Sequence, residues 1–424
     1  MRKFFFVFLF VLGSINAVAQ VTLEDVRRDP NVSANTNRAY PAQERSAISK
    51  APRGYKPFYA YYIGRHGSRF LTGKTSYTHI LGVFENADAV NALTPKGKDV
   101  LRRLRVIAAD AAGRYGYLTR TGQRQLYGIS ERMYENFPEI FAKDGLKIEA
   151  ISTNVRRVIG TMEAYCERMK QLNPSASITM TPGSPIYGEW GSDTPGEKDV
   201  RDADTPFGRR YRQIKEEYTK PDRLMGVLFT NPSYPDSIGV KRSVIQDELF
   251  SIASIAQSVD LEFLDYNLYD IFTPEELYEL SVIRNYEVYV KYGSSPETAP
   301  VKNHMIHKPM ELMIERAEGA WKDGSSDVFM VFCHDGNVGP YAAALKIPWA
   351  YSDTVVDPKE VSDVYSSGTA VSMACNLQFI FYRNRKGKVL VKVLLNEREA
   401  VLPIGINGTP YNDWETFKSF ALSK

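Results

Sequence analysis

Two strongly β-prone stretches, far apart in the chain, each run directly into a loop of chemically reactive side chains. The first stretch, residues 55–63 (YKPFYAYYI), leads into residues 64–69 (GRHGSR). The second, residues 328–333 (VFMVFC), leads into residues 334–337 (HDGN). Open α/β sheets bind their ligands at the carboxyl ends of strands. The pattern therefore predicts an α/β fold whose chemistry lies in these two loops.

Helical periodicity surrounds these strands. Apolar positions recur at helical spacing in residues 93–112, 119–137 and 155–172. The other expected elements are helices at 244–264, 274–292, 309–321 and 338–345 and strands at 146–151, 374–382 and 389–395, the last two joined by a turn at 386–387. This alternation of strand, loop and helix predicts a sheet flanked by helices.

A change of pattern divides the chain into parts. Residues 173–300 carry Pro/Gly punctuation and long helical patterns, which predict a mainly helical cap inserted into the fold. Residues 51–172 and 301–424 are expected to form the two parts of an α/β core, and residues 20–50 an irregular arm. Such a chain exceeds the usual size of a single core, which favours either two lobes or a domain that carries a large insertion.

Residues 1–19 have the pattern of a signal peptide. Arg2 and Lys3 precede an apolar run at 4–12, and residues 17–19 (AVA) supply a cleavage site. The run is shorter than the roughly 20 residues that span a bilayer, although an uncleaved anchor is the alternative. We expect cleavage before Gln20, export to the periplasm or the medium, and no membrane span in the mature chain.

The overall charge points to no polyanionic partner. Because 53 basic residues face 50 acidic ones, nothing indicates binding to nucleic acid or to a membrane surface, and any anion site must gather its charge locally. The three cysteines, Cys166, Cys333 and Cys375, match no zinc pattern and favour buried free thiols. An oxidising compartment could still join two of them.

The first loop places a histidine between two arginines. Arg65 and Arg69 carry guanidinium groups that bind phosphate bidentately and stay charged. Gly67 lets the backbone approach a ligand closely, and His66 can attack phosphorus to form a covalent intermediate. A basic surface loop is the plain alternative, which the position at a strand end disfavours.

The second loop and one further helix start complete this chemistry. His334 is a candidate phosphate ligand, and a carboxylic acid at Asp335 could protonate a leaving alkoxide, a contribution of roughly 10²–10⁴-fold. Either residue could instead cap the following helix. Arg156 and Arg157 begin a helix after a short strand, where they either face the same sheet edge or are solvated.

Taken together, these motifs resemble the histidine acid phosphatases, and within them the multiple inositol polyphosphate phosphatases. The RHG tripeptide alone is shared with phosphoglycerate mutases, whereas the length, the helical insertion and the His-Asp loop select the acid phosphatase branch. Further matches are residues 118–126 (LTRTGQRQL), 268–277 (LYDIFTPEEL) and 391–403 (VKVLLNEREAVLP). The resemblance implies a phosphoglycerate-mutase-like mixed sheet flanked by helices, with an inserted helical cap.

The resemblance also implies a role for each site residue. The implied roles are His66 as nucleophile, Arg65, Arg69, Arg157 and His334 as phosphate ligands, Asp335 as proton donor, and Asn337 as a substrate contact. Apart from the resemblance, Lys74 lies just past the first motif and could contact a second phosphate of a polyanionic substrate. For Lys74, an exposed loop lysine is an equal alternative. Two positions depart from the family: Leu71 stands where a proline is usual, and His-Asp-Gly replaces the His-Ala-Glu of many inositol polyphosphate phosphatases.

The expected function is that of an exported phosphomonoesterase acting through a phosphohistidine on inositol polyphosphates such as phytate. The alternatives are a sugar-phosphate or nonspecific acid phosphatase of the same fold and, more distantly, a non-catalytic phosphoanion-binding protein. We expect no metal and no organic cofactor. His304 and His307 are three residues apart but have no matching third ligand nearby, so a role at the start of a helix is favoured over a metal pair.

Overall fold

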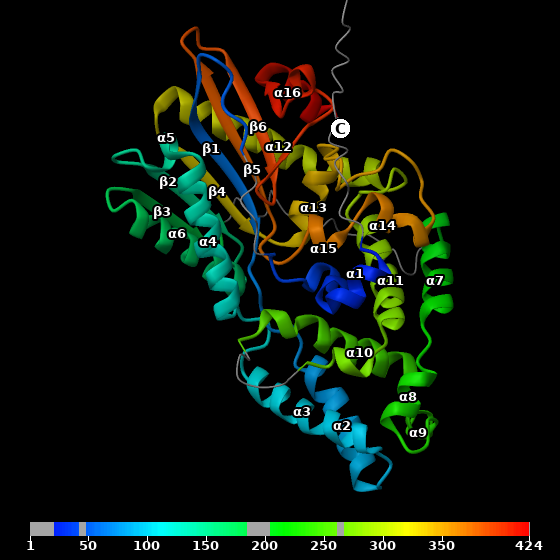
Figure 1. Ribbon diagram of the computed structural model, residues 1–424. Coiled ribbons are helices and arrows are strands. Elements are labelled where there is room, and N and C mark those ends of the chain that lie inside the picture. Colours follow the sequence, from blue (N-terminus) through cyan, green and yellow to red (C-terminus); the bar gives the residue numbers. More distant parts are fainter. Residues whose placement is uncertain (1–20, 42–47, 185–203, 261–266, 424) are drawn as a thin grey trace, which may run out of the picture.

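A central sheet with helices on both faces stands above a separate group of helices (Figure 1). This computed structural model describes residues 21–41, 48–184, 204–260 and 267–423. The expected signal peptide, residues 1–19, lies outside the described residues. Among the described residues, no helix is both long enough and apolar enough to cross a membrane.

The sheet is mixed, as predicted, and its order is β3-β2-β4-β1-β5-β6-β7, with β8 paired to β6. Its strands are β1 (Tyr55–Arg65), β2 (Lys147–Ser152), β3 (Ser177–Pro182), β4 (Val328–Cys333), β5 (Asn376–Asn384), β6 (Val389–Leu395), β7 (Arg398–Ala400) and β8 (Tyr411–Asp413). The strand β1 is parallel to β4 and antiparallel to β5. Parallel pairing brings the carboxyl ends of β1 and β4 to the same edge.

Alternate residues of β1 pack into two different cores. Tyr59, Tyr61 and Ile63 lie in the core on one face, and Ala60 and Tyr62 lie in the core on the other. Because helices cover both faces, this central strand is apolar and aromatic along its length rather than alternating with polar residues.

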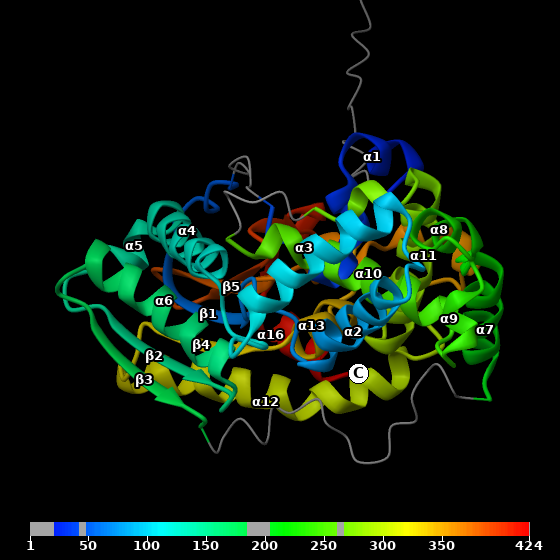
Figure 2. The same cartoon turned by 90° about the horizontal axis from the view of Figure 1, so that it is seen from below.

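Helices from both ends of the chain cover these two faces. On one side lie α4 (Arg120–Asn136), α5 (Pro138–Phe141) and α6 (Arg156–Leu172); on the other lie α12 (Ala299–Asp323), α13 (Asp335–Ala344) and α16 (Trp414–Leu422). Figure 2 shows the strands between α4 and α6 on one side and α12 on the other. The predicted mixed sheet flanked by helices is therefore confirmed.

A helical lobe lies beyond the end of the sheet and has its own core. It contains α2 (Thr75–Ala89), α3 (Pro95–Ala111), α8 (Asp222–Leu228), α9 (Tyr234–Ser237) and α10 (Arg242–Ile255). Both α2 and α3 come from residues 51–172, which were expected to belong to the α/β core. They join this lobe because their apolar faces, including Phe84 and Leu104, pack with Leu249 and Phe250 of α10. The lobe is thus built from two segments, of which the predicted insertion supplies one.

The remaining helices of the described residues lie outside these groups. They are α1 (Leu23–Arg28), α7 (Pro206–Tyr218), α11 (Pro274–Lys291), α14 (Val361–Val364) and α15 (Ser367–Ala370), with short 3₁₀ helices at Pro30–Asn37, Ala256–Ser258, Tyr269–Ile271, Pro358–Glu360 and Ile406–Gly408. The helix α11 contributes Leu277 to the core of the lobe and Tyr286 to that of the sheet. It therefore ties the two parts together.

Two segments differ from expectation. Residues 20–50 were predicted to be irregular, but α1 begins with a capping box of Thr22 and Asp25, and its Val26 is buried. The helix expected to begin at Pro309 begins ten residues earlier, at Ala299, and Pro309 lies inside it. A proline suits the first turn of a helix, which is why it resembled a start signal.

Candidate active site

Hydrogen bonds from two neighbouring strands hold the first reactive loop. The backbone nitrogen of His66 donates to the Cys333 carbonyl at 3.1 Å, and the His66 carbonyl accepts from the Ala374 nitrogen at 2.9 Å. The preceding nitrogen, on Arg65, donates to the Cys375 carbonyl at 2.8 Å. The ends of β1 and β4 therefore meet, and the rings of His66 and His334 lie 5.7 Å apart between centroids.

Glycine is required where this loop meets the start of α4. A Cβ added to Gly67 would lie 2.7 Å from the carbonyl oxygen of Gly122, closer than real contacts allow. A Cβ on Gly122 would in turn lie 2.3 Å from the Ser68 carbonyl oxygen. The Gly67 nitrogen also donates to Thr161 Oγ1 of α6 at 3.1 Å. Close packing against α4 and α6 thus fixes the loop that carries His66.

The His66 imidazole is held in one tautomer. Its Nδ1 lies 2.9 Å from the Gly67 carbonyl oxygen, and because a carbonyl can only accept, Nδ1 carries the proton and Nε2 the lone pair. The side chain is buried. Burial and then the charges of Arg65, Arg69 and Arg157 hold the pKa of His66 well below its usual value. The ring therefore stays neutral, and nucleophilic at Nε2, at acidic pH.

Three arginines surround this histidine, and little negative charge compensates their positive charge. Arg65 is 1% exposed and donates through Nη1 to the carbonyls of Thr36 at 2.6 Å and Val371 at 2.7 Å. The Nε atoms of Arg65, Arg69 and Arg157 are all buried without a hydrogen-bond partner among the described residues. Burial and the neighbouring Arg65 and Arg157 lower the pKa of Arg69 to about 10. An anion would satisfy these donors and relieve the repulsion.

The structure separates the two adjacent arginines of α6. Arg156 is exposed, and its guanidinium donates to the Tyr117 hydroxyl. Arg157 is less exposed, and burial followed by the charge of Arg65 lowers its pKa. Only Arg157 of this pair is among the charges that lower the pKa of His66. The predicted preference for Arg157 over Arg156 thus agrees with the placement of these residues, although the role itself stays a prediction.

The second reactive loop opens α13. Asp335 is the first residue of that helix, and its carboxylate lies 3.3 Å from Arg65 Nη2. Burial alone would raise the pKa of this carboxyl, but Arg65, a hydrogen bond from Tyr292, Arg69 and His334 together hold it below its usual value. The carboxylate is therefore ionised in the free protein at all but strongly acidic pH.

Two of the predicted substrate contacts lie differently from the rest. Asn337 is buried, and its Oδ1 accepts from the His334 backbone nitrogen at 3.2 Å, so this oxygen serves the start of α13. Lys74 is exposed just before α2 and is not among the charges that shift the pKa of His66 or Asp335. The structure thus brings five predicted site residues together around His66, with Asn337 beside His334; the five are Arg65, Arg69, Arg157, His334 and Asp335.

The structure also locates the histidines considered as a metal pair and the cysteines considered for a disulfide. His307 lies on α12 with Nδ1 3.7 Å from Glu311, and in the described ranges no group of three or more His, Cys, Asp or Glu could hold a metal ion. Cys166, Cys333 and Cys375 are free and buried. Burial raises the pKa of the Cys166 and Cys375 thiols to about 12, which makes both unreactive.

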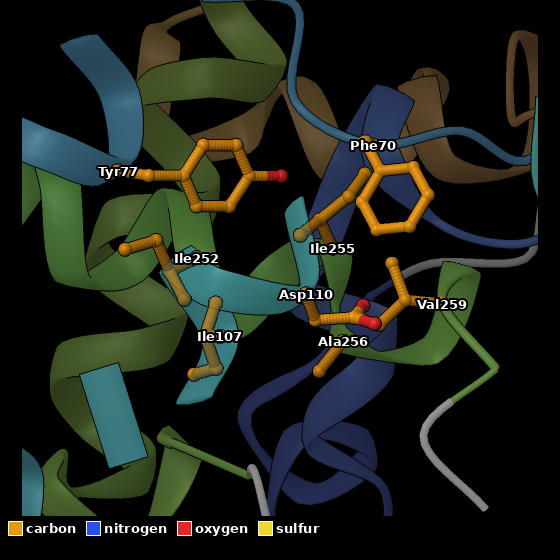
Figure 3. A pocket seen from close by; sticks show the side chains of 8 residues that line it. All are labelled: Phe70, Tyr77, Ile107, Asp110, Ile252, Ile255, Ala256 and Val259. Carbon is orange, nitrogen blue, oxygen red and sulfur yellow. The ribbon is translucent and has the colours of Figure 1, made fainter. Parts of the chain in front are cut away.

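An apolar pocket adjoins the loop just after Arg69 (Figure 3). It lies between α2, α3 and α10 and is lined by Phe70, Tyr77, Ile107, Asp110, Ile252, Ile255, Ala256 and Val259. Leu71, where the family usually has proline, donates its backbone N–H to the Tyr77 hydroxyl at 2.8 Å. Because a proline has no N–H, this hydrogen bond explains how the loop is anchored despite the substitution.

Sequence reasoning missed three groups that contact the site. The carbonyls of Thr36 and Val371 hold Arg65, and Tyr292 is one of the groups that lower the pKa of Asp335. The carbonyls leave no trace in side-chain patterns. Tyr292 lies among the many aromatic residues at the end of α11, where its spacing marks it only as a core residue.

Comparison with known proteins gives matches of structure only. No protein-family model and no curated protein sequence matches the chain. The Bifidobacterium longum multiple inositol polyphosphate phosphatase, solved in complex with inositol hexasulfate, matches with a TM-score of 0.74 and 18% identity, over 91% of this chain and 97% of that one. The phytase from D. castellii matches with a TM-score of 0.62 and 13% identity, over 93% and 84%.

A third solved structure agrees with these two. The Hafnia alvei phytase in complex with myo-inositol hexakis sulphate has a TM-score of 0.55 and 13% identity, over 88% of this chain and 97% of that one. At such low identity the likeness establishes the fold. The resemblance inferred from the motifs is therefore confirmed at that level: this chain has the fold of the multiple inositol polyphosphate phosphatases and phytases.

Proposed function

We propose that the protein is a phosphomonoesterase that forms a phosphohistidine on His66. The observation that carries this proposal is the set of three arginines around a neutral imidazole, where burial and the neighbouring Arg65 and Arg157 lower the pKa of Arg69 to about 10. A phosphoryl group supplies the negative charge and the acceptor oxygens that these donors lack. A loop built only for stability has no need to gather three mutually repelling cations.

In the first step, the lone pair of His66 Nε2 attacks phosphorus and the P–O bond to the alcohol breaks. Arg65, Arg69, Arg157 and His334 bind the oxygens of the transferring group, whose charge they stabilise. Asp335 gives its proton to the leaving alkoxide, so the alcohol departs neutral and the carboxylate is left ionised. The proton on Nδ1 stays with the Gly67 carbonyl as acceptor and orients the ring.

In the second step, water attacks the phosphohistidine. The Asp335 carboxylate accepts a proton from this water, the P–N bond breaks, and the electron pair returns to Nε2. Orthophosphate takes this proton as it leaves, so Asp335 is again ionised in the free enzyme until the next substrate brings a proton. One residue thus serves as acid and then as base, which requires a carboxyl whose two forms are both accessible in the complex.

The low pKa of Asp335 implies that its proton arrives with the substrate. The second pKa of a phosphate monoester is about 6, so below that pH the ester carries a proton into the site. Its negative charge offsets the arginines that hold the Asp335 carboxyl ionised. We therefore expect activity to rise as pH falls from 7 towards 5, while the lowered pKa of His66 keeps the nucleophile neutral.

We infer that the substrates are inositol polyphosphates. Two of the structural neighbours are complexes with inositol hexasulfate or its myo-inositol form, hexasulfated analogues of phytate. The His-Asp-Gly sequence at 334–336 favours a second candidate, a phosphatase of smaller monoesters, because an aspartate reaches one methylene less far than a glutamate. Given the pattern of residues 1–19, we also propose that the enzyme is exported before it acts.

Phosphate release by the chain from Gln20 onwards tests this function. We expect His66-dependent release from phytate and from p-nitrophenyl phosphate, and a loss of at least about 10³-fold in the His66→Ala variant. His79→Ala is the matched control, since His79 lies in the helical lobe paired with Glu248 at 2.8 Å. Alkaline quenching should trap a labelled phosphohistidine in the parent enzyme alone.

The outcomes separate the candidates. Release from the aryl ester with little from phytate would move the substrate to a smaller monoester. Full activity in His66→Ala would refute the mechanism. A protein that inorganic phosphate stabilises against heat, but that releases no phosphate from either ester, would be a phosphoanion-binding protein instead.

A further inference from the structure

Ser68 lies between Gly67 and Arg69 in the first reactive loop, and it is fully buried. Its backbone nitrogen donates to Gln125 Oε1 of α4 at 2.9 Å, which fixes the orientation of that amide, because a backbone N–H can only donate. Gln125 Nε2 donates in turn to Ser68 Oγ at 2.9 Å. The Ser68 carbonyl accepts from the nitrogen and the hydroxyl of Thr119, the N-cap of α4, at 2.9 and 3.1 Å. Every polar group of Ser68 therefore has a partner on α4 or at its start.

The segment that follows α10 supplies a further contact to Ser68. Ser258 lies in the short 3₁₀ helix after α10 and is fully buried, and its hydroxyl donates to Ser68 Oγ at 3.0 Å. Its carbonyl accepts from Thr119 Oγ1 at 2.6 Å. Two residues later, Asp260 Oδ2 accepts from the Arg120 nitrogen at 2.8 Å, where a carboxylate also suits the positive end of a helix. The helical lobe therefore contacts both the first reactive loop and the start of α4.

The residue on the other side of Arg69 also lies against the lobe. Phe70 lines the apolar pocket of Figure 3 together with Ile255 and Val259, and its backbone nitrogen donates to the Tyr117 carbonyl at 3.1 Å. Arg69 Nη1 donates to the Phe70 carbonyl at 3.0 Å. Because this guanidinium is bound to the backbone of its own loop, its position depends on how the residues on either side of it are held.

We propose that Gln125 and Ser258 are positioning residues, which fix Ser68 so that the Arg69 guanidinium is held where it binds the transferring phosphoryl group. This inference rests on the proposed function. It gives a role to residues 118–126 (LTRTGQRQL), whose match to the family has no part in the mechanism above. The network is made of neutral amides and hydroxyls, so it alters placement without altering charge. Placement matters because a shift of about 1 Å can cost about 10²-fold in rate.

The first test compares Gln125→Met with Gln123→Met. Methionine keeps the length of the side chain and removes both hydrogen bonds to Ser68. We expect kcat/KM for p-nitrophenyl phosphate to fall about tenfold, while the limbs of its pH profile stay in place because no charge changes. Gln123 is exposed on the same helix, and its Nε2 donates to the Tyr127 hydroxyl at 3.1 Å, so Gln123→Met should keep the parent value.

Ser258→Ala is the second variant, and it removes a single hydroxyl from the network. The loss of one neutral hydrogen bond to Ser68 should lower kcat/KM about threefold to fivefold. This small change keeps the test decisive if Gln125→Met folds poorly. Ser254→Ala is its control, because Ser254 is also fully buried near the end of α10 but donates to the Ser251 carbonyl at 2.8 Å.

A double-mutant cycle with Arg69→Ala separates positioning from general stabilisation. If Gln125 acts through Arg69, Gln125→Met should cost less than about twofold in the Arg69→Ala background, because the group that it places is already absent. A tenfold loss in both backgrounds would overturn the inference and leave Gln125 a structural residue. An undiminished kcat/KM in Gln125→Met and Ser258→Ala would overturn it as well.

The ¹H–¹⁵N signal of the Arg69 Nε–H gives a readout that needs no turnover. This nitrogen is buried, and its signal is the one that Arg69→Lys lacks. Its exchange with water should be about tenfold faster in Gln125→Met and unchanged in Gln123→Met. Equal exchange rates in the parent and in Gln125→Met would contradict the inference. If the parent enzyme hydrolyses neither ester, the proposed function fails, while the exchange rates still decide whether Gln125 holds Arg69 in place.

Discussion

The helical lobe and the end of the central sheet both bury arginine, but they treat its charge in opposite ways. Arg103 of α3 is 3% exposed and pairs with Asp99 at 2.7 Å and with Asp270 at 2.8 Å. Burial alone would lower its pKa, but hydrogen bonds and charge from Asp270 and Asp99 raise it. At the end of the sheet, burial and two neighbouring cations lower the pKa of Arg69 to about 10.

The difference lies in the number of anions. The two carboxylates that pair with the buried Arg103 also bind the more exposed Lys96 and Arg102, whereas among the described residues Asp335 is the one carboxylate that acts on Arg69 or Arg157. A buried cation without a partner destabilises a fold. A cluster of three cations is therefore expected only where a bound anion compensates their charge. Arg103 therefore stabilises the lobe through its ion pairs, whereas the arginines at the sheet end carry charge that a bound anion would compensate.

The largest effect that this comparison predicts is on catalysis. Arg69→Ala should lower kcat/KM for phosphate esters by about 10²–10³-fold, because a donor to the transferring group is lost. Removing one of three repelling cations should leave the urea midpoint unchanged or raise it. Steady-state kinetics and urea unfolding on the same preparation measure both quantities. A variant that loses stability in proportion to activity would show that Arg69 is a structural residue like Arg103.

The opposite pattern is expected in the lobe. Arg103→Met should lower the free energy of unfolding by about 2 kcal/mol, less than the loss of a fully buried pair, because the carboxylates of Asp99 and Asp270 remain 38% and 45% exposed. Its kcat/KM should stay within a few-fold of the parent value below the unfolding temperature. A large loss of activity in a stably folded Arg103→Met would mean that the lobe contributes to the site more directly than its contacts indicate.

The residues at the centre of the site could largely be predicted from the sequence. The two motif loops could be found because each follows a strong strand, and parallel pairing of β1 with β4 then brings His66 next to His334. The preference for Arg157 over Arg156 came instead from the family resemblance, in which the spacing to an aromatic residue, here Tyr165, selects Arg157. Local pattern, together with one rule of topology, was therefore enough for the two motif loops, whereas the third arginine needed the resemblance.

What sequence reasoning missed depends on contacts between distant segments. The helices α2 and α3 join the helical lobe because their apolar faces meet α10, and amphipathic periodicity does not say which partner a face will have. The hydrogen bond from the His334 backbone nitrogen to Asn337 Oδ1 at the start of α13 was not predicted, and the contact of Asn337 with substrate stays a prediction. The clamp on Arg65 consists of backbone carbonyls, which any residue type supplies. These features follow from tertiary packing rather than from residue type.

The smallest effect concerns the pH dependence of the two neighbouring arginines of α6. Burial is the largest cause of the low pKa of His66, followed by Arg65, Arg69 and Arg157, so Arg157→Gln removes the weakest of three charges. The pKa of His66 should then rise, fewer molecules should carry a neutral ring at acidic pH, and the acid limb of kcat/KM should move up by roughly half a unit to one unit. Profiles with p-nitrophenyl phosphate isolate this shift, since titration of the ester is common to all variants.

Arg156→Gln removes an equal charge one residue away, from a guanidinium bound to the Tyr117 hydroxyl, and should leave the acid limb of kcat/KM in place. Equal shifts in both variants would mean that His66 responds to net charge across the pocket mouth, and the uncompensated cluster would then extend beyond the three buried arginines.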